Sequence, residues 1–567
     1  MSWRTCCRYE DWRTRGMTRH IAVVTITALL AVPSLADAQV TYERILNAAD
    51  EPENWLTYSG SYDSQRHTGL DQITADNVTD LELKWVHQAD SLQAFETSPL
   101  VVDGIMYLTE APNTVVALDA KLGRVFWVYE YTPSNESRPC CGAVNRGLGI
   151  LGDTLFMATL DANLIAIDIW SGKPIWIKDV ADPELGYAMT LAPLVLKDKV
   201  VVGVAGGEFG IRGFIAAFDA ETGDESWRFY TIPGPGEPGH ETWEGGGDAW
   251  EHGGAPVWLT GSYDPALNLT YWGIGNPGPD WNPEQRPGDN LYSDCVVALD
   301  ADTGELKWYF QFTPNDDYDF DAVQIPVLID YTSPNGETLK LMLWGNRNGF
   351  FYVLDREGGR FVSGSPYVDV NWAEGLDDSG RPVETPQPAG SPTFPGIFGG
   401  TNWYSPSYSP STGLFYLSAW EAYGAIMEPA EAEYQPGRIF MGGRTRPTGV
   451  AGAPRLPGLG RGHVNNWTAE AGQGAVKAID PTTGEEMWKF EMTDVTTSGI
   501  LTTASDLLFT GGREGYFHAL DATNGELLWK TTLGGMIANG PIAYGVDGNQ
   551  FVAVAAGNGL FVFGLRE

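Results

Sequence analysis

Two adjacent cysteines, Cys140 and Cys141, carry the most specific chemistry in this sequence. They stand in the segment RPCCGAVNRG. Neighbouring cysteines can close a vicinal disulfide, an eight-membered ring that forces the peptide between them out of its ordinary geometry and is flat, rigid and apolar. The alternatives are two free thiols, or a bond from one of them to Cys295. The cysteine pair by itself leaves these alternatives open.

A repeat runs through the chain on both sides of these cysteines. Each copy begins with a triplet of two apolar residues and an Asp. A Gly stands four residues after the Asp, and a Trp stands eight residues after it. Because the Trp keeps a fixed offset, we interpret it as a packing residue between repeats and not as a ligand. The complete copies are Asp119/Gly123/Trp127, Asp168/Gly172/Trp176, Asp219/Gly223/Trp227, Asp300/Gly304/Trp308, Asp480/Gly484/Trp488 and Asp521/Gly525/Trp529, and a copy at Asp355/Gly359 lacks the Trp.

Each copy has the pattern of a β-hairpin, with a strand ending in Asp, a turn whose Gly can take positive φ, and a second strand carrying Trp. Hairpins that recur at mostly 41 to 55 residues are typical of propeller blades. The gap from Asp355 to Asp480 is long enough for two blades, and the segment 408–416 in it resembles a degenerate copy. Trp85 is expected to complete a blade closed by both chain ends. We therefore predict an all-β, eight-bladed β-propeller.

Composition and charge narrow the function. The formal net charge is −38, so the surface should repel phosphate backbones and anionic lipid. This excludes a nucleic-acid role and leaves small neutral substrates, cations, or a partner with a basic patch. No CxxCH motif occurs, so any haem is expected to belong to a partner.

Residues 1–38 have the form of a secretory signal peptide. A short basic region precedes the apolar run 21–35, and an A-x-A cleavage motif ends at Ala38. The run is too short to span ~30 Å of hydrocarbon comfortably, and no later segment reaches that length. We expect export, cleavage near Ala38, and a single mature propeller domain, 39–567, in an oxidising compartment; Met17 is an alternative start.

Five separated segments resemble the pyrroloquinoline quinone (PQQ)-dependent alcohol dehydrogenases, the methanol and ethanol quinoprotein dehydrogenases. They are PCCGAVNRG, GGEFG (206–210), GNPGP (275–279), TPNDDYDFD (313–321) and RNGFFYVLDR (347–356), and they follow one another in the family order. The resemblance extends from about Asn54 to the C-terminus. It implies an eight-bladed quinoprotein propeller located in the periplasm.

The family pattern, carried over position by position, implies a PQQ site. Cys140 and Cys141 would form a disulfide on one face of the quinone, and Trp258 would stack on the other, because a planar cofactor is held by aromatic burial in a slot. Arg146 would face a cofactor carboxylate, and Arg347 would approach the quinone oxygens; for a lone arginine, the alternative is a surface ion pair. The remaining contacts are implied at Glu96, Thr190, Gly206, Gly207 and Asn402.

The same resemblance implies a metal and a base. Glu208 and Asn276 match the metal ligands, and Asp319 matches the base that takes the hydroxyl proton as hydride moves to the quinone. Asp321 stands two places after Asp319, where the resemblance implies a small or uncharged residue for calcium enzymes and Asp for the lanthanide-dependent subclass. An extended segment would place both carboxylates on one side, and a third anionic ligand suits a trivalent ion. We therefore favour a lanthanide(III), with Ca(II) as the alternative. The other interpretation of NDDYDFD is an acidic stretch in an acidic protein.

Three positions depart from the family pattern. Ala205 stands where Ser is common and Pro256 where Thr contacts the cofactor, so two cofactor hydrogen bonds are expected to be absent or replaced. Thr497 aligns with a Trp beside the cofactor. A smaller residue there widens the cavity and favours alcohols larger than methanol.

The resemblance implies an enzyme that oxidises a primary alcohol to the aldehyde and passes electrons to a soluble cytochrome c. The alternatives are a Ca-dependent quinoprotein acting on a sugar or polyol, and a non-enzymatic propeller scaffold such as an outer-membrane assembly factor, which shares the repeat. A scaffold has no reason to place the cysteine pair and the acidic residues among its blades. A homodimer is left open, and Cys295 is expected to be a buried structural cysteine.

Overall fold

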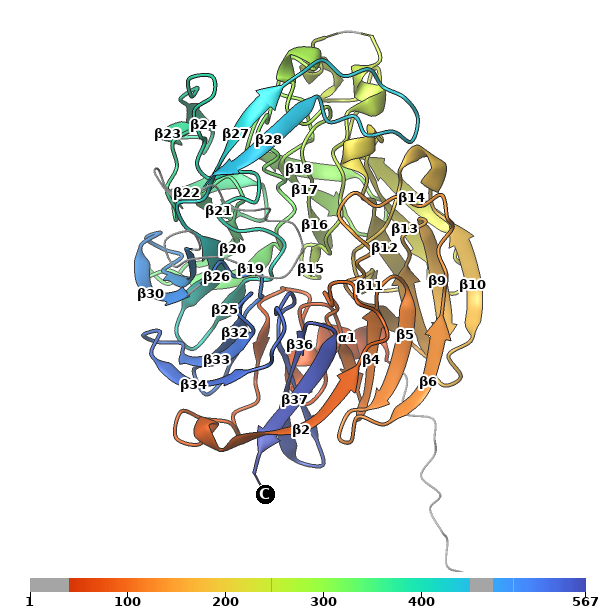
Figure 1. Ribbon diagram of the computed structural model, residues 1–567, viewed down its shortest axis with the longest axis vertical. Coiled ribbons are helices and arrows are strands. Elements are labelled where there is room, and N and C mark those ends of the chain that lie inside the picture. Colours follow the sequence, from red (N-terminus) through yellow and green to blue (C-terminus); the bar gives the residue numbers. More distant parts are fainter. Residues whose placement is uncertain (1–39, 246, 449–472, 493, 567) are drawn as a thin grey trace, which may run out of the picture. The chain divides into compact units, whose positions relative to one another are not determined.

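The computed structural model describes residues 40–245, 247–448, 473–492 and 494–566. The expected signal peptide lies outside the described residues. Residues 39–567 form one compact unit, whose sheets are arranged as eight blades around a central axis (Figure 1). This confirms the predicted eight-bladed propeller. No helix in the described ranges is long and apolar enough to cross a membrane, and the α-helix α1 spans only Tyr42–Leu46.

The first five blades each use four consecutive antiparallel strands. Blade 1 is β3 (Leu100–Val102), β4 (Ile105–Glu110), β5 (Thr114–Asp119) and β6 (Val125–Glu130); blade 2 is β7 (Gly149–Leu151), β8 (Thr154–Ala158), β9 (Asn163–Asp168) and β10 (Pro174–Asp179). Blade 3 is β11 (Leu194–Leu196), β12 (Lys199–Gly203), β13 (Phe214–Asp219) and β14 (Glu225–Tyr230). Blade 4 is β15 (Ser262–Asp264), β16 (Leu269–Gly273), β17 (Cys295–Asp300) and β18 (Leu306–Gln311); blade 5 is β19 (Val327–Thr332), β20 (Thr338–Gly345), β21 (Phe350–Asp355) and β22 (Arg360–Pro366).

The last three blades depart from this order. Blade 6 is β25 (Ser407–Ser409), β26 (Leu414–Trp420), β29 (Gly474–Ile479) and β30 (Glu486–Met492). Blade 7 is β31 (Leu501–Thr503), β32 (Leu507–Gly511), β33 (Tyr516–Asp521) and β34 (Leu527–Thr532), with the short β1 (His67–Thr68) added parallel to β31. Blade 8 joins β35 (Ile542–Val546), β36 (Asn549–Ala556) and β37 (Gly559–Leu565) to β2 (Leu81–Gln88). Trp85 therefore lies in the outer strand of a blade closed by both chain ends, as expected.

The described residues between Asp355 and Asp480 do not form an extra blade. The hairpin at 408–416 is formed by β25 and β26, the two inner strands of blade 6. The repeat Asp480 directly follows β29, the third strand of the same blade. The prediction of a separate degenerate copy there is wrong. Insertions explain the length of the gap: the hairpin of β23 (Ala373–Leu376) with β24 (Pro382–Glu384), and that of β27 (Gly424–Pro429) with β28 (Gly443–Thr448). We call residues 424–448 the cap.

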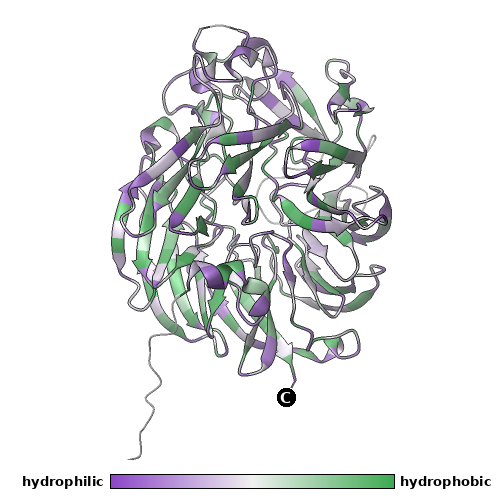
Figure 2. Cartoon of the chain, turned by 180° about the vertical axis from the view of Figure 1, so that it is seen from behind, coloured by the Kyte–Doolittle hydropathy of each residue, from purple (hydrophilic) through white to green (hydrophobic). Residues whose placement is uncertain are grey.

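Each blade buries its middle strands on both faces. β4 and β5 of blade 1 are almost wholly buried, whereas the outer strand β6 alternates between exposed and half-buried residues. Strands covered on both faces need continuous apolar runs, which is why the two residues before each repeat Asp are Ala, Val, Ile, Leu or Phe. Hydrophobic residues, coloured green, are accordingly concentrated in the strands of the blades (Figure 2).

The repeated Trp joins each blade to the next. The indole Nε1 of Trp127 in blade 1 donates to Ile169 O in blade 2 at 3.0 Å. Its ring lies against Gly172, where an added Cβ would lie 2.5 Å from Trp127 Cε3, and Gly172 has φ of +66°. Only Gly fits a turn with that φ under an indole ring. The Trp is therefore a packing residue, which confirms the prediction.

Blade 5 lacks this Trp and joins blade 6 by polar contacts. Ser365 Oγ donates to Gly484 O at 2.9 Å, on the glycine that meets an indole in other blades. The buried Lys477 ammonium of blade 6 donates to the carbonyl oxygen of Tyr367, which follows β22 of blade 5, at 2.6 Å. Side-chain to backbone hydrogen bonds thus connect the two blades where the stacked ring is missing.

Candidate active site

A cavity of about 420 Å³ lies on the propeller axis. Its wall includes residues from the segments that enter every blade in turn, which places it at the centre of the ring. These residues are Glu96, Arg146, Thr190, Trp258, Asp319, Asn402, Thr497 and Ala538. The volume falls within the range of small-molecule and cofactor pockets, roughly 300–1,000 Å³.

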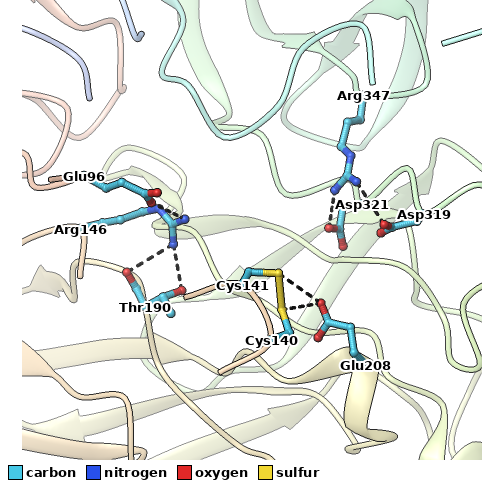
Figure 3. The surroundings of a disulfide bond; sticks show 9 residues. All are labelled: Glu96, Cys140, Cys141, Arg146, Thr190, Glu208, Asp319, Asp321 and Arg347. Carbon is cyan, nitrogen blue, oxygen red and sulfur yellow. Dashed lines mark hydrogen bonds and ion pairs between the residues drawn. A yellow bond between two sulfur atoms is a disulfide. The ribbon is translucent and has the colours of Figure 1, made fainter. Parts of the chain in front are cut away.

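The two cysteines form one part of this wall. Cys140 and Cys141 are joined by a disulfide, and both line the cavity (Figure 3). Cys295 is a free, fully buried thiol on β17. The structure therefore contains the vicinal disulfide and neither of the alternative states, and Cys295 is the buried structural cysteine that was expected.

Arg146 organises one side of the cavity. Its guanidinium is 2.8 Å from Glu96 Oε2, and its Nη1 donates to Thr190 Oγ1 at 2.9 Å (Figure 3). The guanidinium carbon also lies over the rings of Trp258 and Trp403, at 5.1 and 5.2 Å from their centroids. A buried carboxylate and two aromatic faces fix this cation, so the alternative of a surface ion pair is wrong for Arg146.

Arg347 organises an acidic group on another side. Its Nη1 donates to Asp321 Oδ2 at 2.5 Å, and its Nη2 lies 3.4 Å from Asp319 Oδ2 (Figure 3). The other Asp321 oxygen, Oδ1, accepts the backbone N–H of Asn276 at 3.0 Å. A Cβ at Gly275 would clash with that oxygen, so the close approach requires glycine. Asp319 and Asp321 therefore contact Arg347 directly, and Asn276 contacts Asp321. The Arg347 side chain is buried.

The segment 313–321 reaches this arrangement through turns. It contains no strand, and Asp319 and Asp321 have φ of +63° and +26°. The expectation of an extended segment is wrong, but both carboxylates still converge on Arg347 because each backbone turn re-aims the side chain. Asp316 holds the loop by accepting the N–H groups of Tyr318 and Phe320 at 3.0 and 2.8 Å. Non-glycine residues with positive φ are often found at functional sites.

Burial sets the electrostatics of the acidic group. It raises the pKa of Asp319 well above its ordinary range; Arg347 opposes this rise, and the nearby carboxylates of Asp321 and Glu208 add to it. The Asp319 side chain keeps 23% of its surface accessible, and it lines the cavity. Asp319 is therefore a carboxylate with raised basicity that faces the open space.

Glu208 links the disulfide to the acidic group. It lies in a short 3-10 turn, Gly207–Phe209, and its Oε1 is 2.8 Å from Cys140 Sγ. Sulfur atoms joined in a disulfide are not thiolates, so this contact is not itself a thiolate metal site. Glu208 and Asn276 line the cavity together with Asp319 and Asp321, and their oxygens are hard donors of the kind that bind hard cations.

One predicted residue has a different position. The cavity is lined by Gly206 and Glu208 and not by Gly207, where an added Cβ would lie 3.0 Å from Pro256. The other predicted site residues all line the cavity, as do the departing residues Ala205, Pro256 and Thr497.

Several residues of the cavity wall were not predicted from the sequence. Trp403 directly follows Asn402, and proximity in sequence could have found it. Arg513 stands in GGREG, which repeats the pattern of GNRNG around Arg347. The cap contributes Ile439 and Met441, for which the sequence offered no repeat or motif.

The cap is fixed over Glu208. The Phe440 N–H donates to Glu208 O at 2.7 Å, and the Trp281 N–H donates to Met441 O at 3.0 Å. These bonds hold the side chains of Ile439 and Met441 against the cavity, and Ile439 is 67% exposed. The rim of the cavity is therefore apolar at the cap.

Comparisons with known proteins agree with this geometry. A family model described as "Glucose/ethanol/alcohol dehydrogenase, beta-propeller domain" matches residues 55–371, and one described as "Outer membrane protein assembly factor BamB" matches residues 472–564. The quinoprotein alcohol dehydrogenase PedH of Pseudomonas putida is 36% identical, over 96% of this chain and 93% of its own. The quinoprotein ethanol dehydrogenase of Pseudomonas putida is also 36% identical, over 95% of this chain and 91% of its own.

Solved structures show the same relationship. A europium-containing methanol dehydrogenase superimposes with a TM-score of 0.84 at 33% identity, covering 92% of this chain and 100% of that one. The quinohemoprotein alcohol dehydrogenase ADHIIG of Pseudomonas putida gives a TM-score of 0.85 at 33% identity, covering 93% of this chain and 82% of that one.

Proposed function

Because the chain belongs to the PQQ-dependent alcohol dehydrogenases, we propose that it oxidises a primary alcohol to the aldehyde in the central cavity. The observation that carries the proposal is the convergence of the vicinal disulfide, Trp258, Arg146 and the Asp319 group on one axial cavity. PQQ, when bound, would supply the electrophilic carbonyl that accepts hydride.

The residues of the cavity fit a flat, anionic cofactor. The disulfide and Trp258 provide rigid apolar walls, and a slot with such walls favours a planar ring. Arg146 is already held by Glu96 and Thr190, so it would meet a carboxylate without further ordering. We assign Glu96, Thr190, Gly206 and Asn402 to the remaining polar contacts, and Gly207 to a supporting position behind Pro256.

Glu208, Asn276, Asp319 and Asp321 would hold the metal ion. Three of these are carboxylates, and Arg347 is the cation that the structure shows next to two of them. A trivalent ion suits three anionic oxygen ligands better than a divalent ion does. The similarity to a europium-containing dehydrogenase supports the same choice, so we propose a lanthanide(III), with Ca(II) as the alternative.

Asp319 would take the hydroxyl proton of the alcohol. Its accessible surface faces the cavity, so an alcohol bound there would meet this carboxylate. Arg347, whose Nη2 lies 3.4 Å from Asp319 Oδ2, would keep the Asp319 carboxylate oriented. The alcohol would enter under the cap, where Ile439 and Met441 favour apolar chains larger than methanol.

We also propose the cellular setting. The expected leader 1–38 and the family membership support a periplasmic enzyme, with a soluble cytochrome c as the acceptor of its electrons. The negative formal charge of −38 would attract a basic partner.

The scaffold alternative rests on the blade repeat, which the BamB family model also matches at residues 472–564. That range holds Thr497, Arg513 and Ala538 but none of the residues of the disulfide or the acidic group. The match therefore follows the repeat and not the site, and we favour the enzyme.

The test is dye-linked alcohol oxidation by the apoprotein reconstituted with PQQ and either La³⁺ or Ca²⁺, over short, long and aromatic alcohols. We expect turnover with La³⁺ and better kcat/KM for the larger alcohols. Turnover with Ca²⁺ alone would overturn the lanthanide assignment, and a sugar or polyol as best substrate would support the alternative enzyme. Absence of PQQ binding with both ions would overturn the proposed function.

A further inference from the structure

Two blades carry the same turn in the same place. Residues 345–349 (GNRNG) connect β20 to β21 in blade 5, and residues 511–515 (GGREG) connect β32 to β33 in blade 7. In both, the first glycine pairs with the Phe two residues after the last glycine, and the last glycine donates its N–H to the second residue at 3.1 Å. Arg347 and Arg513 therefore occupy equivalent positions in the repeat.

Arg513, like Arg347, is buried and lines the cavity. The residue is 6% exposed. Its Nε lies 4.0 Å from Asp494 Oδ2, a long ion pair compared with the 2.5 Å between Arg347 and Asp321. Burial raises the pKa of the Asp494 carboxyl, and Arg513 only partly opposes that rise. An arginine side chain that lines a cavity offers donors to an anionic ligand there.

Arg513 lies across the propeller axis from Glu208, one of the proposed metal ligands. Glu208 follows the second strand of blade 3 and Arg513 follows the second strand of blade 7, and these blades are opposite in a ring of eight. The turn is fixed beside the segment containing Thr497, because Thr496 Oγ1 donates to Gly511 O at 2.8 Å. The small side chain of Thr497 leaves the cavity open next to the guanidinium.

We propose that Arg513 is a further cofactor-binding residue, which contacts a carboxylate of PQQ from the blade 7 side of the cavity. The inference rests on the proposed function, since it requires PQQ in this cavity. A planar guanidinium binds a carboxylate with two parallel hydrogen bonds, which an amide or a hydroxyl cannot do. Arg513 would thus add a charged contact to the anionic cofactor on the side of the cavity away from Ala205 and Pro256.

The experiment measures the Kd of PQQ for the apoprotein by quenching of tryptophan fluorescence, at fixed La³⁺. We expect Arg513→Gln to weaken PQQ binding by about 10- to 100-fold, the effect of losing a charge-assisted hydrogen bond. Arg381→Gln is the matched control, because Arg381 is an exposed arginine that pairs with Asp289 on the surface. That variant should bind PQQ as the wild type does.

PQQ trimethyl ester separates a direct contact from a structural role. If Arg513 binds a carboxylate, Arg513→Gln should weaken PQQ but leave the Kd of the ester unchanged; an equal loss for both ligands would show a structural role and overturn the inference. Arg513→Lys keeps the charge and serves if the Gln variant does not fold, with a several-fold weaker Kd expected for PQQ alone. Wild-type protein that binds no PQQ would overturn the proposed function itself, whereas wild type and Arg513→Gln with equal Kd would overturn only this inference.

Discussion

Replacement of Asp321 tests the metal assignment most directly. Its carboxylate accepts one hydrogen bond from Arg347 at 2.5 Å and one from the Asn276 N–H at 3.0 Å, and only 8% of the side chain is exposed. Asp321→Asn keeps an oxygen that can accept the Asn276 N–H and removes the charge. Asp321→Ala removes both, so the pair of variants separates charge from positioning.

The structure gives the size of the expected effect. Removing one partner of a buried ion pair lowers the stability of the fold by about 3–5 kcal/mol, of which Asp319, 3.4 Å from Arg347, can recover a part. Metal affinity is a separate quantity: each variant loses one of three charged oxygen ligands, and a loss of about 100-fold in affinity for a trivalent ion corresponds to about 3 kcal/mol of binding free energy. We expect this loss in both variants, a smaller loss for Ca²⁺, and a lower melting temperature in Asp321→Ala than in Asp321→Asn.

The assay is terbium luminescence sensitised by the tryptophans of the cavity, with La³⁺ and Ca²⁺ as competitors, followed by turnover of the reconstituted enzyme. Asp378→Asn is the control, because Asp378 is an exposed carboxylate outside the cavity. The reasoning is refuted if Asp321→Asn binds La³⁺ within about threefold of the wild type, or if Asp321→Ala retains lanthanide-supported turnover.

Three other perturbations have defined outcomes. Gly172→Ala should destabilise the fold by about 1–3 kcal/mol in chemical denaturation, because its Cβ would press on Trp127, whereas Gly413→Ala has a similar φ of +70° with open space and should cost less. Burial lowers the pKa of His518 to about 4, so the unfolded chain binds a proton at a higher pH than the folded chain does. The stability of the fold should therefore fall by up to about 3 kcal/mol as the pH drops from about 6.5 to about 4. In pH-dependent unfolding, His518→Gln should flatten this slope. Met441→Ala should shift the ratio of kcat/KM toward bulkier alcohols by about tenfold, and an unchanged alcohol series would show that the cap does not select the substrate.

The blades could be predicted because their determinants are local. A buried triplet, a turn Gly and a docking Trp recur at fixed offsets, and each has a physical cause within one hairpin and its neighbour. The cap could not be predicted, since residues 424–448 follow no repeat and take their position from contacts with Glu208 and Trp281. Their length instead suggested a further blade.

Some residues of the site could be predicted from the sequence, and others could not. The disulfide and the acidic pair stand out in sequence because they break the repeat, and the cavity brings them together. Arg513 was missed because it belongs to the repeat: nothing in GGREG marks it until the structure shows that the turn faces the same cavity as GNRNG. Asp319 and Asp321 converge through left-handed backbone turns, which an alternating pattern does not reveal.

The seam of blade 8 has a consequence for how the protein is made. β2 pairs with β37 along Leu81–Gln88 and Gly559–Leu565, strands separated by nearly the whole chain. Such a contact forms only after a loop of that length has closed, so ring closure must await synthesis of the last strand. Met536 and Ala538, which line the cavity, directly precede β35, the first of the three C-terminal strands of that blade. We therefore expect the complete axial cavity, and with it a retained cofactor, only after β2 and β37 have paired.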